Sequence, residues 1–220
     1  MKKPLSVGVG GSKSGVGKTS FVEDFIRYIK NQNSKITITA VKYTKTSLYS
    51  SIITEPQLED IGKDTNRMKK AGADYLVWVK AKEEDLQEIV FKLKEYVNNL
   101  STNIVIIEGN SLVRLMQPDI IIFLKGKNNK CIKSSARALI EKADILIEED
   151  YSLEKIMKEI EFIQKRKLIY QLLREKSSNG RISCAEARKI AEELLISYIE
   201  VGKAANELGV KIIKCELGCF

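Results

Sequence analysis

The 220-residue sequence contains no histidine, only three prolines and a single tryptophan. The absence of histidine removes the commonest general base and the commonest metal ligand, so any such site must use Cys, Asp, Glu, hydroxyl groups or bound phosphate. Apolar runs are short, Ile120–Leu124 being an example, whereas a bilayer crossing needs roughly 20 residues. The basic N-terminus leads directly into a glycine-rich loop, unlike a signal peptide. The sequence therefore predicts a cytoplasmic protein without a membrane segment.

Acidic residues are fewer than basic ones, with 29 Asp and Glu against 37 Lys and Arg, for a net charge of +8. A basic excess of this size suits an anionic partner such as a nucleotide or a nucleic acid, and a well-solvated surface explains it equally. Hydrophobic residues make up 44% and charged residues 30% of the chain, which is typical of a globular protein.

Short apolar segments alternate with helical stretches through residues 1–150. Continuous apolar runs indicate strands covered on both faces, so we expect an α/β domain with a doubly wound, mainly parallel sheet. The expected strands are Leu5–Val9, Ile36–Val41, Tyr75–Val79, Ile104–Ile107, Ile120–Leu124 and Ile145–Ile147. The expected helices are Thr19–Asn31, Leu58–Ala71, Glu83–Asn98 and Ser134–Lys142, and Thr44–Pro56 is expected to be a mobile loop.

A glycine-rich stretch, GGSKSGVGKTS, lies between the first expected strand and the first expected helix. Its Gly17-Lys18-Thr19 matches the end of the phosphate-loop pattern G-x-x-x-x-G-K-[ST], and Ser12 stands where that pattern begins with glycine. Glycines let backbone N–H groups turn toward an anion, and the helix directs its N-terminus to the same place. The sequence predicts a P-loop NTPase domain, with a plain glycine-rich turn as the alternative. The expected nucleotide-binding residues are Ser12, Lys13, Ser14, Gly15, Val16, Gly17, Lys18, Thr19 and Ser20.

The expected Mg²⁺ ligands lie at the loop and at the end of a later strand. Lys18 is expected to contact the β and γ phosphates, and the Thr19 hydroxyl to ligate Mg²⁺. Glu108 follows Ile104–Ile107, at the sheet edge where open α/β folds bind ligands, and a carboxylate without a ligand is the alternative. Asp64 is a third candidate, either in a switch segment or in an exposed first turn of a helix. No residue stands out as a general base, so we expect slow hydrolysis.

The segment KSGVGKT resembles the deviant Walker motif of the MinD, ParA and Mrp-like ATPases. In those ATPases the first lysine reaches the nucleotide of the second subunit. The resemblance implies catalytic roles for Lys13 and Lys18 and a nucleotide-dependent homodimer. Ser14 departs from the glycine of that motif, and an exposed loop lysine is the alternative for Lys13.

Four stretches together resemble the molybdopterin-guanine dinucleotide biosynthesis adaptor family, MobB: SGVGKTS, ITAVKYTKTS, GKDTNRMKKAGADYLVWV and IVIIEGN. The resemblance covers roughly residues 5 to 125. It implies binding of GTP or a related nucleotide with Mg²⁺ and an accessory role toward a client metalloenzyme or cofactor-maturation protein in molybdenum cofactor assembly. The family usually has histidines after the second strand, where this chain has Tyr43 and Lys45. No [NT]-K-x-D motif reads guanine, so GTP and ATP both stay open.

Residues 151–220 are expected to form a small helical module, with helix-turn-helix-like spacing over Ile190–Ile212. Its second helix would carry Glu200, Lys203, Asn206 and Glu207, of which two are acidic, so the composition argues against DNA binding and favours an interaction module. Leu153–Lys176 is expected to be one long helix or two.

Four cysteines form the last candidate site. Clustered cysteines in a cytosolic protein indicate metal or redox chemistry more than a structural disulfide. Cys184, Cys215 and Cys219, completed by Cys131 or a second subunit, could hold an iron–sulfur cluster or Zn²⁺. Buried free thiols and a redox disulfide are the alternatives.

The sequence thus predicts a Mg²⁺-dependent nucleotide-binding accessory of molybdenum cofactor or other metallocofactor maturation. An iron–sulfur delivery ATPase of the Mrp-like kind is the second hypothesis. A nucleotide-responsive DNA-binding regulator is the third.

Overall fold

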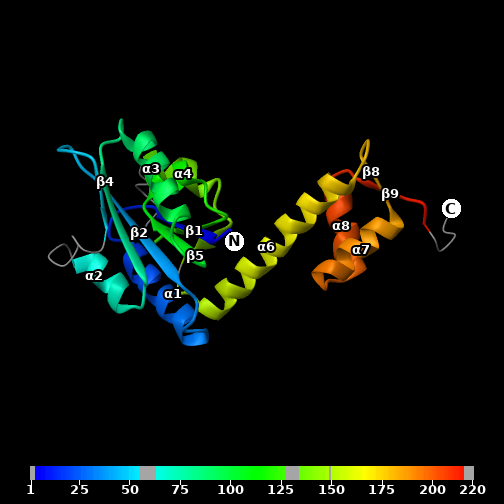
Figure 1. Ribbon diagram of the computed structural model, residues 1–220, viewed down its shortest axis with the longest axis horizontal. Helices are drawn as coiled ribbons and strands as arrows, with labels where there is room; N and C mark the ends of the chain where they lie inside the picture. The colour runs from blue at the N-terminus through cyan, green and yellow to red at the C-terminus, as the bar shows by residue number, and fades with distance from the viewer. Residues whose placement is uncertain (1–2, 55–62, 127–133, 149, 216–220) are drawn as a thin grey trace. The chain divides into compact units, whose positions relative to one another are not determined.

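The computed structural model describes residues 3–54, 63–126, 134–148 and 150–215 (Figure 1). The chain divides into two compact units, Met1–Ile156 and Met157–Phe220. Helix α6 (Leu153–Lys176) begins in the first unit and continues into the second. No helix in the described parts of the chain is both long and apolar enough to cross a membrane.

The first unit is built on a seven-stranded sheet of order β3-β4-β2-β5-β1-β6-β7. Neighbouring strands are parallel except β3 and β4, which are antiparallel. All residues of β5 and β6 are buried, which is why these segments are uniformly apolar up to the carboxylate at the end of β5. The strands are β1 (Leu5–Gly11), β2 (Ile38–Lys45), β3 (Ser51–Thr54), β4 (Tyr75–Ala81), β5 (Ile104–Glu108), β6 (Ile120–Leu124) and β7 (Ile145–Ile147).

Helices cover both faces of this sheet. Helices α1 (Lys18–Gln32) and α2 (Lys63–Lys70) lie on one face (Figure 1). Helices α3 (Leu86–Asn98), α4 (Asn110–Met116) and α5 (Ser134–Ile140) lie on the other. The core on the α3 side contains Val79, Leu93, Ile107, Leu112 and Phe123, all fully buried. The predicted doubly wound, mainly parallel α/β fold is therefore confirmed.

The prediction of a loop over Thr44–Pro56 is wrong at Thr44–Lys45 and Ser51–Thr54, which are strands, whereas Thr46–Ser50 between them is neither helix nor strand. Strand β2 continues to Lys45, and β3 forms within the segment as an edge strand along β4. The Ser50 hydroxyl donates to Asp85 (2.6 Å) and accepts from the Lys82 N–H (3.0 Å), so a polar side chain secures the start of β3. Residues 55 and 56 lie outside the described residues, as do residues 58–62 of the expected second helix.

Helix α4 is a second difference from prediction. It has only seven residues, begins directly after Gly109, and buries Leu112 and Val113. Several other elements have shifted ends; for example, β1 extends to Gly11, β2 begins at Ile38 and α3 begins at Leu86. The predicted strand ends were placed by apolar character, whereas the β1–β6 hydrogen-bonded ladder continues past Val9 into Gly10 and Gly11.

The second unit consists of α6, β8 (Arg181–Ser183), α7 (Cys184–Leu194), α8 (Tyr198–Glu207) and β9 (Lys211–Ile213). The Leu153–Lys176 segment is one helix, the first of the two predicted alternatives, and two short helices joined by a tight turn follow it, as the helix-turn-helix-like spacing predicts. Ser183 and Ser197 cap α7 and α8, which explains why both helices begin where they do. The most buried members of the core of this unit are Leu173, Ile190, Ala191, Val201 and Ala205.

Asp119 joins the starts of β1 and β6 and should make the first unit sensitive to acid. Its carboxylate accepts from the Ser6 N–H (2.9 Å), the Ser6 hydroxyl (2.6 Å) and the Lys3 ammonium (2.8 Å). Partial burial acts to raise the pKa of Asp119, but the bonds from Lys3 and Ser6 outweigh it and lower that pKa. A lowered folded-state pKa means that the stabilisation is present above the unfolded value, near 3.9, and is lost as the pH falls through the folded value.

We expect Asp119→Asn to lower the free energy of unfolding by about 1 kcal/mol at pH 7, a modest value because the carboxylate is one third exposed. The difference from the unsubstituted chain should shrink below pH 4. Urea unfolding at pH 7 and at pH 3, followed by the fluorescence of Trp78 on β4, measures the free energy of unfolding of both proteins. A difference that is the same at pH 7 and pH 3 would contradict the assignment.

Candidate nucleotide-binding site

The glycine-rich loop joins the end of β1 to the start of α1. Strand β1 ends at Gly11 and α1 begins at Lys18. Gly15 (φ 75°) and Gly17 (φ 96°) have left-handed backbones that other residues adopt at a cost, and Gly17 is the N-cap of α1 without a side-chain cap. The first N–H groups of a helix need partners from outside it, and an anion at the N-terminus is a favourable one. This is the geometry that phosphate loops require.

Neighbouring elements hold this loop in place. Ser12 is buried, its N–H donates to the Leu124 carbonyl (3.0 Å), and its hydroxyl donates to the Lys125 carbonyl (2.8 Å). Asn110 accepts from the Gly11 N–H and donates to the Gly11 carbonyl, both at 2.9 Å. The start of the loop is therefore fixed by side-chain and backbone bonds to β6 and α4 before any ligand binds.

A hydroxyl, a carboxylate and an ammonium meet at the start of α1. The Thr19 hydroxyl lies 3.0 and 3.1 Å from the two Glu108 carboxylate oxygens. The Lys42 ammonium lies 2.8 and 3.0 Å from the same oxygens and 2.9 Å from the Thr19 oxygen. The structure thus brings together the two residues that the sequence proposes as Mg²⁺ ligands, and adds a lysine that the sequence analysis missed.

Strand register explains this convergence. Lys42 on β2 pairs with Glu108 on β5, and Val9 on β1 pairs with Glu108 from the other side. Paired residues of parallel strands point to the same face of the sheet, so Lys42 and Glu108 both face α1 and its Thr19. Both side chains are largely buried, with 13% and 6% of their surface exposed.

A cleft of about 430 Å³ opens beside the loop. Three lysines and one carboxylate contribute charge to its lining, which suits a polyanionic ligand: Lys13, Lys18, Lys45 and Glu83. The remaining lining comes from Gly11, Ser14, Tyr43, Gly109, Asn110, Ser111 and Ser135.

Three side chains of the cleft wall have shifted pKa values. The hydrogen bond from Lys45 lowers the pKa of Glu83, and the same bond (2.5 Å) raises the pKa of Lys45. Burial raises the pKa of Tyr43. At neutral pH this wall of the cleft therefore presents a charged pair and a neutral phenol.

The predicted loop residues all lie between β1 and α1 or in the first turn of α1. Lys13 is exposed, and its carbonyl accepts from the Lys18 ammonium at 3.2 Å. The Ser20 hydroxyl accepts from Arg67 of α2 (3.1 Å), which also donates to Glu23 of α1 (2.9 Å). The catalytic roles of Lys13 and Lys18 stay predictions. Asp64 lies in α2, but its side chain is outside what the structure describes, so its Mg²⁺ role also stays a prediction.

The candidate metal cluster is only partly covered by the structure. Cys184 and Cys215 are partly exposed and follow the parallel strands β8 and β9, at the same end of that small sheet. Cys131 and Cys219 lie outside the described residues. Among the residues that are described, no group of three or more Cys, Asp or Glu side chains could hold a metal. The cluster stays a prediction.

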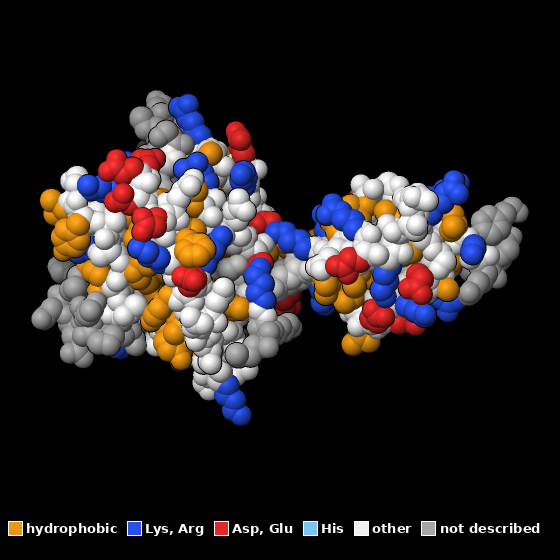
Figure 2. All heavy atoms as spheres, turned by 45° about the horizontal axis from the view of Figure 1, so that its top comes forward, with side chains coloured by type: hydrophobic (Ala, Val, Ile, Leu, Met, Phe, Trp, Pro, Cys, Tyr) orange, Lys and Arg blue, Asp and Glu red, His pale blue; other side chains and the backbone are white. Residues whose placement is uncertain are grey.

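On the face of the second unit seen in Figure 2, acidic and basic side chains are interspersed. Duplex binding needs basic residues to neutralise phosphates, and Glu207 of α8 is instead paired with Arg166 of α6 (2.8 Å). These mixed charges and the Glu207–Arg166 ion pair do not favour the DNA-binding hypothesis.

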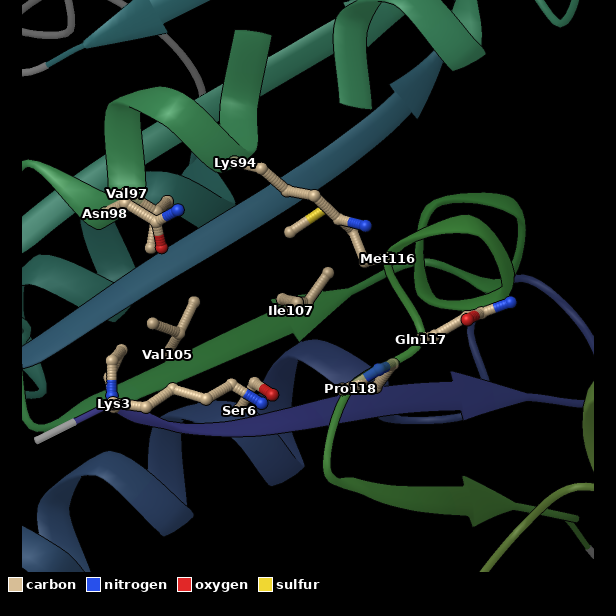
Figure 3. A pocket seen from close by; sticks show the side chains of 11 residues that line it. Lys3, Ser6, Lys94, Val97, Asn98, Val105, Ile107, Met116, Gln117 and Pro118 are labelled. Atoms are coloured by element: carbon tan, nitrogen blue, oxygen red, sulfur yellow. The ribbon is translucent and has the colours of Figure 1, made fainter. Parts of the chain in front are cut away.

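A second cleft, of about 340 Å³, is lined by none of the predicted nucleotide-binding residues (Figure 3). Val105 and Ile107 of β5 and Met116 of α4 give it an apolar wall, and Lys3 and Lys94 contribute the charged groups. None of the described residues that line it is a carboxylate, and the hydroxyl of its Ser6 is held by the Asp119 carboxylate (2.6 Å) in the contact that joins β1 to β6.

Sequence reasoning missed Lys42 and Asn110. An isolated lysine near the end of an apolar strand, as in ITAVKY, is a usable signal for a charged group at the ligand edge. Asn110 follows Glu108 by two residues in IIEGN, but its bonds to Gly11 depend on contacts between residues 99 positions apart.

Comparison with known proteins adds the family. The model of molybdopterin guanine dinucleotide synthesis protein B, MobB, matches residues 7–143. No curated protein matches the chain. A structure of the signal recognition particle receptor FtsY from Elizabethkingia anophelis is similar at 12% identity and a TM-score of 0.35, covering 74% of this chain and 65% of the receptor. The same receptor in complex with GDP is similar at 14% identity and a TM-score of 0.33, covering 64% and 44%.

This chain thus spans less than two thirds of the length of either receptor structure. At TM-scores of 0.35 and 0.33, these similarities indicate nothing about the function of this chain. The family match is different, because it covers more than half of the 220 residues and includes the loop, Lys42 and Glu108. The chain belongs to the molybdopterin guanine dinucleotide synthesis protein B (MobB) family.

Proposed function

We propose that this protein binds a purine nucleoside triphosphate, GTP or ATP, together with Mg²⁺, and acts as an accessory in molybdenum cofactor maturation. The observation that carries the proposal is the contact between Thr19 and Glu108 at the carboxyl edge of a parallel sheet, directly after Lys18, which lines the cleft beside a glycine loop with left-handed turns. Membership of the MobB family supports the maturation role.

In this proposal each group at the loop has one task. The backbone N–H groups after Gly15 and Gly17 and the Lys18 ammonium hold the β and γ phosphates. The Thr19 hydroxyl and the Glu108 carboxylate fit Mg²⁺, which prefers oxygen donors. When bound, Mg²⁺ neutralises charge on the phosphate oxygens. The nucleotide-dependent homodimer rests on the resemblance of Lys13 to the first lysine of the deviant Walker motif, and sedimentation with and without nucleotide tests it.

Hydrolysis is expected to be slow. Phosphoryl transfer needs mainly positioning and charge stabilisation, plus a group that orients water. Among the described residues that line the cleft, Glu83 is paired with Lys45, and no other carboxylate faces the cleft. We infer that nucleotide binding, more than rapid turnover, is the working step toward a client protein.

Titration with fluorescent mant-GTP and mant-ATP, with Mg²⁺ and with EDTA, tests the proposal and shows whether the site prefers guanine or adenine. We expect Thr19→Ala to weaken binding of the Mg²⁺ complex about tenfold, equivalent to about 1.4 kcal/mol, and to change metal-free binding little. The reason is that Thr19 contributes through the metal more than through the phosphates.

The matched control is Thr37→Ala, which removes a hydroxyl just before β2, at the opposite end of that strand from Lys42. It should bind both nucleotides as the unsubstituted chain does. Failure of the unsubstituted protein to bind either nucleotide at millimolar concentration would reject the proposed function.

A further inference from the structure

We propose that the Lys42 ammonium is a built-in cation of the Mg²⁺ site. In the nucleotide-free protein it occupies the Thr19–Glu108 pair and excludes free divalent metal. Mg²⁺ therefore enters only together with a nucleotide. This inference rests on the proposed function, because it concerns the order in which metal and nucleotide bind to that same site.

The contacts of Lys42 are those of a metal substitute. Its ammonium reaches both oxygens of Glu108 and the Thr19 hydroxyl within 2.8–3.0 Å. These are the groups that the proposed function assigns to Mg²⁺, which binds oxygen ligands at about 2.0–2.1 Å. An ammonium and a metal ion cannot both occupy the space between one hydroxyl and one carboxylate.

Burial makes this occupation favourable. The Glu108 side chain is only 6% exposed, and a carboxylate buried without a counter-charge is destabilising. Lys42 supplies that counter-charge from the adjacent strand, in register with Glu108. Free Mg²⁺ gives up its water shell reluctantly, so two protein ligands are insufficient for it to displace the ammonium.

A bound nucleotide favours Mg²⁺ over the Lys42 ammonium at the Thr19–Glu108 pair in two ways. Its phosphate oxygens add ligands to the metal, and their negative charge gives the displaced ammonium a new partner. Lysine suits this exchange, because its charge sits on a flexible four-carbon chain with rotatable donors. The same residue thus keeps the site intact when empty and contacts phosphate when the site is loaded.

Another lysine–carboxylate pair in the same unit provides the comparison. Lys30 of α1 lies 2.7 Å from Asp74, and both side chains are partly buried. Asp74 also accepts from the Ile38 N–H (2.7 Å), so this pair fixes the start of β2. No phosphate loop adjoins it at that end of β2, and its loss should leave metal binding unchanged.

The experiment titrates Mn²⁺, an oxygen-seeking substitute for Mg²⁺, into the nucleotide-free full chain, and follows unbound Mn²⁺ by electron paramagnetic resonance. We expect Lys42→Met to bind one Mn²⁺ at least tenfold more tightly than the unsubstituted chain, and Lys30→Met to match the unsubstituted chain. Adding Glu108→Gln to Lys42→Met should abolish the gain. Equal Mn²⁺ affinity of Lys42→Met and the unsubstituted chain would overturn the proposal.

Thermal stability is measured alongside, because removal of Lys42 takes away the counter-charge of the buried Glu108 carboxylate. Mn²⁺ should raise the thermal midpoint of Lys42→Met, and of Lys42→Gln as a second variant, but not that of the unsubstituted chain. Unfolding of both variants that Mn²⁺ does not reverse would show a purely structural ion pair and overturn the proposal.

The two proposals fail separately. The Mn²⁺ titration uses no nucleotide, so its outcome does not depend on mant-GTP or mant-ATP binding. If the protein binds nucleotide but Lys42→Met has unchanged Mn²⁺ affinity, only the proposed role of Lys42 is rejected. A protein that binds no nucleotide would sink the proposed function, whatever the Mn²⁺ result.

Discussion

Replacement of Lys18 by alanine is expected to weaken binding of the Mg²⁺–nucleoside triphosphate complex by about 30- to 200-fold, or about 2–3 kcal/mol. Lys18 is the first residue of α1 and lines the cleft, where its ammonium already donates to the loop carbonyl of Lys13. A charged bond to phosphate in a partly enclosed site is worth more than an exposed ion pair, which contributes less than about 1 kcal/mol. We expect the loss for Lys18 to exceed that of an exposed ion pair, because the loop that holds its ammonium is already folded before the phosphates bind.

The measurement is the same mant-nucleotide titration, and Lys35→Ala is the control. Lys35 is an exposed lysine that follows α1, so its loss removes the same charge from the protein without touching the loop. A loss of less than threefold for Lys18→Ala, or an equal loss for both variants, would show that the phosphates bind elsewhere. In that case the cleft lysines act only through their long-range field, and added salt would remove most of the affinity.

The parts of this site that could be predicted are those encoded locally. Gly17, Lys18 and Thr19 are adjacent in the chain, and Glu108 ends an apolar run, so each was identifiable without knowledge of the strand order. Lys42 was not, because its role depends on β2 lying beside β5, although β3, α2, β4 and α3 separate these two strands in the chain. From the sequence alone, a lysine in an apolar strand indicates a strand end that faces solvent as readily as a charged group in a binding site.

The fold shows the same division between local and long-range information. Serines cap α7 and α8, and such caps are local signals in a sequence, because capping uses residues three positions apart. Strand β3 was missed because its Ser- and Thr-rich surroundings are typical of a loop, and its partner β4 lies beyond α2. The β8–β9 pairing likewise joins segments separated by two helices.

Replacement of Gly109 by alanine is expected to destabilise the first unit by about 3 kcal/mol, through backbone strain and overpacking together. Gly109 lies between Glu108 and α4 and has φ 128°, a conformation that side-chain-bearing residues rarely adopt. A Cβ atom placed there would lie 2.9 Å from the Tyr43 Cβ, so β2 would have to move. Because Glu108 and Asn110 flank this glycine, the displacement should also weaken nucleotide binding.

Urea unfolding followed by Trp78 fluorescence should show a lower midpoint for Gly109→Ala, since Trp78 lies on β4 of the same unit. The control is Gly202→Ala in the interior of α8, where a Cβ atom would meet nothing within 4 Å. The same chemical change should there stabilise helix α8 by about 0.5–1 kcal/mol and leave the Trp78 transition where it was. A midpoint unchanged in Gly109→Ala would mean that the turn after β5 adapts to a side chain. Glu108 and Asn110 would then owe their positions to their own hydrogen bonds and not to the glycine between them.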